Sequence, residues 1–295
     1  MAADVNGCST TYNTSIRNRF LLAHCVVTVD LTNNPVAVFD SGVGSLSIIR
    51  ELKKEIPHED LLYFADRYHF PYGNKSHQQL YEIILASVKF LENYKPKVIV
   101  VASITPSVQI LHKVRTRVSS QIIGVMPPLR AAARLSKKKH IGIMATEGTI
   151  FSQELAALLR KEVAQDVRVT RFNASSIIEL IDNGIYISNE RKTFDTISHL
   201  LMGKLEKEDI DVIILGSTHL SFVQNYLKSL FPRVKFVDPS RIVAKDVKKF
   251  LLHNRMLRRS GVGRLQLIAS GDRKDHFDQT IRLMGFREVI KRVNP

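Results

Sequence analysis

Cysteine is nearly absent from this chain of 295 residues. Only Cys8 and Cys25 are present, and both precede the first segment with the pattern of a buried strand. The rest of the chain therefore offers no thiol for a disulfide, a zinc–thiolate site or a thiol nucleophile. Tryptophan is missing, and no apolar run approaches the 18 residues that a membrane-spanning helix needs. We expect a cytoplasmic protein that does not enter a membrane.

Negative charge is also scarce. The chain has 28 Asp and Glu against 43 Lys and Arg, which gives a formal charge of +15. Residues 241–295 hold 14 of the basic and 5 of the acidic side chains. A basic segment of this kind can bind nucleic acid weakly and without sequence preference, or it can be an ordinary solvated face. The hydrophobic fraction of 44% and the length fit a soluble protein of two domains.

Residues 1–34 differ in composition from the remainder of the chain. They are rich in Ser, Thr and Asn and lack helical or strand periodicity. The apolar run 20–29 follows Arg17 and Arg19, as in a signal peptide, but no small-residue cleavage site comes after it. We expect residues 1–34 to be an extension outside the fold, either disordered or translated from a start site assigned too early.

Residues 36–50 have the pattern of a buried strand, a polar turn and an amphipathic helix. Asp40 and Ser41 come at the end of the strand, and Gly42 and Gly44 let the backbone turn sharply and approach a ligand. Ligands of open parallel sheets bind at this edge. Asp40 and Ser41 are therefore candidate site residues, or simply caps of the helix.

The order of apolar strand, hydroxyl residues and helix recurs along the chain. Hydroxyl residues come after three further strands: Ser103, Thr105, Thr146, Thr149, Ser217 and Thr218. This alternation predicts an α/β protein with parallel sheets, and the prolines at 127 and 128 are a plausible crossing between domains. Hydroxyls presented by two sheets to a shared cleft would suit a small carboxylate ligand.

Six motifs occur in a fixed order. They are Phe39-Asp-Ser-Gly-Val-Gly44, Phe70-Pro-Tyr-Gly73, Ala145-Thr-Glu-Gly-Thr149, Leu215-Gly-Ser-Thr-His219, Asp238-Pro-Ser240 and Ser270-Gly-Asp272. Together they resemble glutamate racemase, in the aspartate/glutamate racemase superfamily. The resemblance implies two flavodoxin-like parallel-sheet domains, 35–127 with 239–295 and 128–238, and a site in the cleft between them.

The resemblance also implies a cofactor-independent, two-base racemisation at the α-carbon of an acidic amino acid. One cysteine thiolate would remove the α-proton, and a second thiol would deliver a proton to the opposite face. Here Ser103 and Ser217 occupy the two thiol positions, and Ile104 occupies that of an asparagine. Asp40 would assist Ser103 and His219 would assist Ser217. An alkyl hydroxyl is not a base near neutral pH without strong activation, so the two-cysteine mechanism is not available.

The same resemblance implies a set of substrate-binding residues. They are Asp40, Ser41, Pro71, Tyr72, Gly73, Thr105, Thr149 and Thr218. The implied ligand is a small acidic amino acid such as glutamate or aspartate. No cofactor and no metal is expected, and a homodimer is compatible with the scheme.

We predict a low-activity or non-catalytic relative that keeps a carboxylate-binding cleft. Three alternatives remain: a racemase that uses serines or another base, serine-mediated hydrolysis in the same cleft, and a nucleic-acid-associated protein that binds through its basic C-terminal region. Simpler structural roles are also open, with Ser103, Ser217 and Asp66 as helix caps and His219 as a hydrogen-bonded interface residue. Dinucleotide binding is disfavoured because the turn at 42–47 lacks a third glycine.

Overall fold

The computed structural model describes residues 32–271 and 276–293. Contacts separate residues 1–30 from residues 31–295, and every helix and strand given below belongs to the second unit. The expectation for residues 1–34 therefore lies almost wholly outside the described residues. None of the helices in the described ranges has both the length and the apolar character to cross a bilayer.

The first sheet has six strands, all parallel, in the order β10-β9-β2-β1-β3-β4. They are β1 (Val36–Asp40), β2 (Leu61–Ala65), β3 (Val98–Val101), β4 (Ile122–Gly124), β9 (Leu265–Ala269) and β10 (Ile290–Arg292). Strands β2, β1, β3 and β4 have the 2-1-3-4 order of flavodoxin-like sheets. All residues of β1, β2 and β3 are buried, as expected of a parallel sheet covered on both faces.

Helices cover both faces of this sheet, because alternate residues of β1 belong to different clusters of buried side chains. Val36 and Val38 pack with α1 (Leu46–Glu55), α13 (Ser240–His253) and α14 (Phe277–Leu283). Ala37 and Phe39 pack with α2 (His77–Glu92) and α4 (Leu111–Val114). The remaining short helices around this sheet are η1 (Val43–Ser45), η2 (Arg67–His69), η3 (Tyr72–Asn74), α3 (Ile104–Gln109) and η4 (Arg115–Arg117).

The second sheet has four parallel strands in the order β6-β5-β7-β8, which is again 2-1-3-4 along the chain. They are β5 (His140–Ala145), β6 (Arg168–Asn173), β7 (Val212–Leu215) and β8 (Lys235–Val237). Its helices are α5 (Leu129–Leu135), α6 (Glu147–Ile150), α7 (Gln153–Glu162), α8 (Ser175–Asp182), α9 (Ile185–Ser188), α10 (Glu190–Leu201), α11 (Lys204–Glu208), η5 (Thr218–Val223) and α12 (Gln224–Leu230). The prediction of an α/β protein with two parallel sheets is confirmed.

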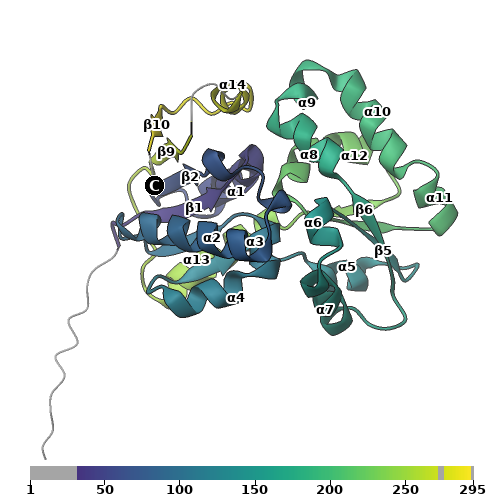
Figure 1. Cartoon of the computed structure of the whole chain (residues 1–295), viewed down its shortest axis with the longest axis horizontal. Helices are drawn as coiled ribbons and strands as arrows, with labels where there is room; N and C mark the ends of the chain where they lie inside the picture. The colour runs from purple at the N-terminus through teal and green to yellow at the C-terminus, as the bar shows by residue number, and fades with distance from the viewer. Residues whose placement is uncertain (1–31, 272–275, 294–295) are drawn as a thin grey trace, which may run out of the picture. The chain divides into compact units, whose positions relative to one another are not determined.

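The order of the strands determines where a ligand can sit. In each sheet the direction of strand order reverses between two neighbours, β1 and β3 in the first sheet and β5 and β7 in the second. Loops at such a switch point diverge and leave a crevice at the carboxyl ends of the strands. The chain passes from the first sheet to the second after β4 (Figure 1). It returns by α13, which packs on α1.

Candidate functional site

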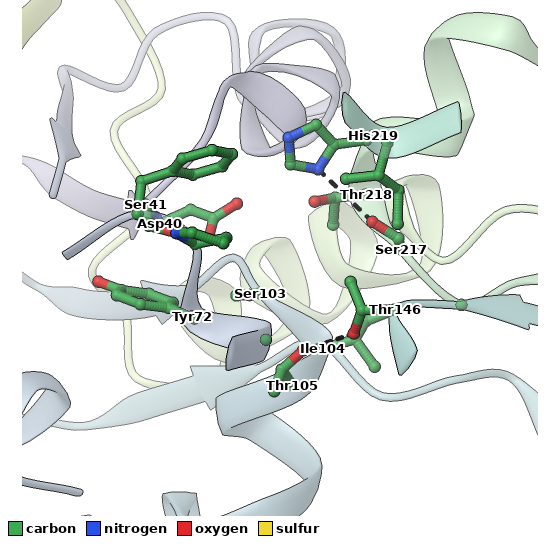
Figure 2. A pocket seen from close by; sticks show the side chains of 15 residues that line it. Asp40, Ser41, Tyr72, Ser103, Ile104, Thr105, Thr146, Ser217, Thr218 and His219 are labelled. Carbon is green, nitrogen blue, oxygen red and sulfur yellow. Dashed lines mark hydrogen bonds between the residues drawn. The ribbon is translucent and has the colours of Figure 1, made fainter. Parts of the chain in front are cut away.

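A pocket opens where these four strands end, and Figure 2 shows its lining. Its residues are Asp40, Ser41, Phe70, Pro71, Tyr72, Gly73, Ser103, Ile104, Thr105, Thr146, Ile178, Gly216, Ser217, Thr218 and His219. Every site residue predicted from the sequence lies in this set except Thr149. The hydroxyl of Thr149 lies 2.8 Å from that of Thr105, directly behind the lining.

The pocket is small in this structure. Its cavity volume is about 40 Å³, which is room for a few water molecules. An acidic amino acid has about ten non-hydrogen atoms and needs considerably more space. The pocket of this structure is therefore smaller than such a ligand.

Asp40 is a buried carboxyl group in the pocket lining, and Figure 2 shows its side chain. Burial raises its pKa to about 6, although the electrostatic interaction with His219 and hydrogen bonds from Ser41 and Ser103 oppose the rise. The backbone N–H of Ser41 donates to the Asp40 Oδ1 atom over 2.7 Å. The pocket thus holds a carboxyl group that titrates close to neutral pH.

A row of polar side chains begins in the pocket lining and continues behind it. The Ser217 Oγ atom lies 3.5 Å from His219 Nδ1, and His219 Nε2 lies 3.4 Å from Asp182 Oδ1. Arg67 Nη2 donates to Asp182 Oδ2 over 3.0 Å, and the Val43 N–H donates to Oδ1 over 3.0 Å. A hydroxyl, an imidazole, a carboxylate and a guanidinium therefore follow one another in hydrogen-bond contact.

The pKa of Asp182 is lowered, in contrast to that of Asp40. Burial alone would raise it, but the hydrogen bond with His219 and the charge of Arg67 outweigh the loss of hydration. Asp182 is therefore ionised at neutral pH. Two buried carboxyl groups near one imidazole thus have pKa values displaced in opposite directions, a pattern common at functional sites.

Sequence reasoning missed Asp182 and Arg67. Asp182 is the last residue of α8, where a negative charge is unfavourable to the helix dipole. An acidic residue at the end of a predicted helix was the signal available in the sequence, but only the fold shows that Asp182 is buried and lies beside the imidazole. Arg67 follows β2 in a turn without any recognisable motif, and its guanidinium stacks on the rings of Phe70 and Phe277.

Gly42 and Gly44 make room for His219. An added Cβ would lie 2.7 Å from the His219 Nε2 atom at Gly42 and 2.3 Å from Nδ1 at Gly44. From the sequence we expected these glycines to let the backbone approach a ligand. In the structure it is the imidazole of His219 that lies close to them. The ring is therefore held against the backbone of the first sheet's β1–α1 turn.

Three threonine hydroxyls meet across the cleft. The Thr105 and Thr149 Oγ1 atoms are 2.8 Å apart, those of Thr146 and Thr149 are 2.9 Å apart, and Thr105 and Thr146 are 3.4 Å apart. Thr105 belongs to α3, which follows the first sheet's β3. Thr146 is the N-cap residue of α6, which follows β5, and Thr149 lies within that helix. Uncharged hydroxyls can turn their protons toward a carboxylate, so this cluster is suited to an anionic ligand.

Asp66 holds the loop that carries Tyr72. The Tyr72 hydroxyl donates to Asp66 Oδ2 over 3.0 Å, Ser270 Oγ donates to Oδ1 over 3.0 Å, and His69 Nδ1 lies 2.9 Å away. Asp66 therefore serves this loop, and within the described residues its side chain caps no helix. Figure 2 shows the Tyr72 hydroxyl pointing away from the pocket, so Tyr72 contributes its ring.

Ser103 and Ser217 precede α3 and η5, at the positions of N-caps. Among the described residues, neither side chain makes the capping hydrogen bond to its own helix. The interpretation of both serines as caps is therefore wrong. The Ser217 hydroxyl faces His219 instead, and the Ser103 hydroxyl interacts with Asp40.

The comparisons with known proteins agree with each other. Residues 45–247 match the family model for Asp/Glu/Hydantoin racemase. The chain is 34% identical to the glutamate racemase of Shewanella frigidimarina over 222 residues, which cover 75% of this chain and 84% of that protein. It is 34% identical to the glutamate racemase of Pseudomonas syringae pv. tomato over 252 residues, covering 84% and 89%.

Solved structures show the same fold. Glutamate racemase isoform RacE1 from Bacillus anthracis superposes with a TM-score of 0.78 and 26% identity, covering 89% of this chain and 98% of that one. Escherichia coli glutamate racemase in complex with L-glutamate and the activator UDP-MurNAc-ala gives a TM-score of 0.76 and 25% identity, covering 88% and 98%. The similarity therefore extends over both sheets.

Proposed function

Because the chain belongs to the Asp/Glu/Hydantoin racemase family, we propose that its pocket binds a small acidic amino acid and that its racemase activity is low or absent. The presence of Ser103 and Ser217 in the pocket lining carries this proposal. They stand where the family resemblance implies two thiols. The relative from Escherichia coli was crystallised with L-glutamate, which supports an acidic amino acid as the ligand.

The pocket offers hydrogen-bond donors for such a ligand. The hydroxyls of Ser41, Thr105, Thr146 and Thr218 lie in or beside its lining. A carboxylate accepts hydrogen bonds only, and a hydroxyl can donate one in whichever direction its proton is turned. These groups support binding of at least one carboxylate in a lining that contains no Lys or Arg.

Proton abstraction is the step that the serines impair. A thiol has a pKa near 8.5 and supplies some thiolate at neutral pH, whereas the pKa of an alkyl hydroxyl is several units higher. Each unit costs about 1.4 kcal/mol in forming the base. Asp40, with a pKa of about 6, is a base on one side of the pocket only. Racemisation also needs a proton donor on the opposite face, so exchange from one side is the most that we expect.

Ile104 weakens the polar character of the pocket further. Its side chain is 3% exposed and lines the cavity beside Ser103. An asparagine there, as the resemblance implies, would supply one acceptor and two donors, whereas isoleucine supplies an apolar wall. We therefore expect weaker binding of acidic amino acids than in a pocket with the amide.

The same proposal includes a division of the chain into two domains, 35–127 with 239–295 and 128–238. The strands of the first sheet all fall in the first set, and those of the second sheet fall in the second set. The site would then lie in the cleft between the domains, since residues of both line the pocket.

Two measurements on the whole chain test the proposal. Isothermal titration calorimetry with both enantiomers of glutamate and aspartate should show weak binding of at least one of them. Incubation with the same ligands in deuterated water, followed by mass spectrometry and chiral analysis, should show little α-deuterium and little inversion. Robust racemisation by the wild-type protein would refute the proposal. A protein that binds none of the four ligands would refute it as well.

Restoring the thiols provides the matched comparison. Ser103→Cys or Ser217→Cys alone should allow exchange from one side at most, because racemisation needs a donor opposite the acceptor. The triple variant Ser103→Cys, Ser217→Cys, Ile104→Asn should give the fastest inversion of the set. If the triple variant binds glutamate and still exchanges no proton, the serines are not what limits the reaction.

A further inference from the structure

The row formed by Ser217, His219 and Asp182 has the composition of an acyl-transfer triad. We propose that Ser217 is a nucleophile that hydrolyses small esters, and that substrates with a free carboxylate fit the pocket best. All three residues are buried, with at most 8% of their surface exposed, and Ser217 and His219 line the cavity. The preference for a free carboxylate rests on the proposed function, whereas the nucleophilic role of Ser217 does not.

Each ring nitrogen of His219 has one partner. Asp182 is ionised, so its carboxylate can only accept a hydrogen bond from His219 Nε2. This hydrogen bond favours the tautomer of His219 that carries its proton on Nε2. Nδ1 can then accept the proton of the Ser217 hydroxyl, 3.5 Å away. In the familiar triads the two nitrogens have exchanged roles, but the requirement of one orienting carboxylate and one hydroxyl is the same.

The imidazole is also held in place. Its ring lies on the backbone of Gly42 and Gly44, where an extra carbon would come within 2.7 Å of it. Arg67 and the Val43 N–H fix the carboxylate of Asp182 from the other side. Catalytic hydrogen bonds of this length are common in unliganded sites and shorten when substrate binds.

The Ser217 hydroxyl is available for chemistry. Ser217 precedes η5, and in the described part of the chain its side chain makes no capping hydrogen bond to that helix. The hydroxyl of Ser221, further along η5, is instead hydrogen-bonded to another serine, with its Oγ atom 3.2 Å from that of Ser240. Ser103 and Thr105, also in the pocket lining, can donate hydrogen bonds to an oxyanion.

The reaction balances without any further reagent. Ser217 Oγ forms a bond to the ester carbonyl carbon while its proton passes to His219 Nδ1. The ester C–O bond then breaks, and the leaving alkoxide takes that proton to become an alcohol. Water repeats the sequence on the acyl-enzyme with the same base. It releases a carboxylic acid and restores the serine hydroxyl.

A fluorophosphonate probe tests the nucleophile directly, because it modifies activated serines covalently. Mass spectrometry of the labelled wild-type protein should find the adduct on Ser217 and not on Ser41 or Ser103. Ser217→Ala should abolish this adduct, and His219→Ala should slow labelling by about 100-fold or more. The matched control Ser221→Ala should label at the wild-type rate.

Hydrolysis gives the second readout. 4-Nitrophenyl acetate should be cleaved by the wild-type protein and not by Ser217→Ala, and the mono-4-nitrophenyl ester of glutaric acid should have the higher kcat/KM. Asp182→Asn should change the pH dependence of the labelling rate, whereas a purely structural role for Asp182 would leave that dependence in place. Thermal melts of each variant establish that it is folded.

The inference is overturned if Ser217 in the wild-type protein carries no adduct while a known serine hydrolase in the same reaction is labelled. It is also overturned if His219→Ala, shown to be folded, labels as fast as the wild-type protein. Glutamate binding without a Ser217 adduct would leave the proposed function intact and remove this inference. An adduct on Ser217 without glutamate binding would support the nucleophilic role of Ser217 and refute the proposed function.

Discussion

Replacing Asp40 with asparagine should stabilise the protein above pH 6. The carboxyl group of Asp40 is buried, and its pKa of about 6 compares with 3.8 for an exposed aspartate. Between these values the folded state holds a proton that the unfolded chain has released, so the free energy of unfolding falls as the pH rises. Above pH 6 the folded protein therefore carries an unfavourable buried charge that asparagine does not have.

The size of the effect follows from the displacement of the pKa. A difference of about 2 units corresponds to about 3 kcal/mol, at 1.4 kcal/mol for each unit. Asparagine keeps an oxygen that can accept from the Ser41 N–H, and its amide can also pair with the Ser103 hydroxyl. In a protein of this size, about 3 kcal/mol corresponds to a rise in melting temperature of roughly 5 °C.

Thermal unfolding of Asp40→Asn and of the wild-type protein between pH 3.5 and pH 8 measures this difference in stability. The melting temperatures of Asp40→Asn and of the wild-type protein should converge near pH 4 and separate as the pH rises through 6. The reasoning is refuted if the difference does not depend on pH, or if the variant is the less stable protein at pH 8.

Asp182→Asn is the matched control with the opposite sign. The pKa of Asp182 is lowered, because the hydrogen bond with His219 and the charge of Arg67 outweigh the effect of burial. Its ionised form therefore contributes stability above pH 3.8 that is lost as the pH falls through the lowered value. Removal of this charge takes away the carboxylate of a buried ion pair with Arg67, so Asp182→Asn should lose about 3–5 kcal/mol at pH 7.

Three other predictions concern packing, ligand affinity and surface charge. Gly44→Ala should cost about 1–3 kcal/mol in urea denaturation, and most of this cost should vanish in a His219→Ala background, where the clash with the ring is absent. Ile104→Asn should tighten glutamate binding in calorimetry by about tenfold, the effect of one or two new hydrogen bonds, and equal affinity would exclude a polar role for this position. A fluorescent oligonucleotide should bind the basic C-terminal region, residues 241–295, weakly, with an affinity that falls more than tenfold between 50 and 200 mM salt, and a salt-insensitive complex would contradict this.

The sequence predicted the parts of the site that come directly after strands. Asp40, Ser103, Thr105 and Ser217 each lie within a few residues of an apolar run, so parallel-strand topology alone places them at one sheet edge. The structure puts all four in the pocket region. Such reasoning needs only local pattern and one general rule of α/β folds.

Other parts of the site depend on packing between distant segments. Asp182 reaches His219 only because α8 packs beside η5, and Arg67 reaches Asp182 only because β2 lies beside β1. The direction of the Tyr72 hydroxyl is decided by Asp66, which belongs to another turn. These contacts between distant segments cannot be predicted from any periodicity or spacing in the sequence.

The contact between His219 and the glycines of the β1–α1 turn has a consequence for spectroscopy. The imidazole comes from the second sheet, and the backbone beneath it comes from the first. Only 8% of the His219 side chain is exposed while this contact lasts. The exchange rate of the ring N–H with deuterated water should therefore rise when the two sheet edges part. A single histidine resonance, followed by NMR with and without glutamate, would report whether this contact loosens.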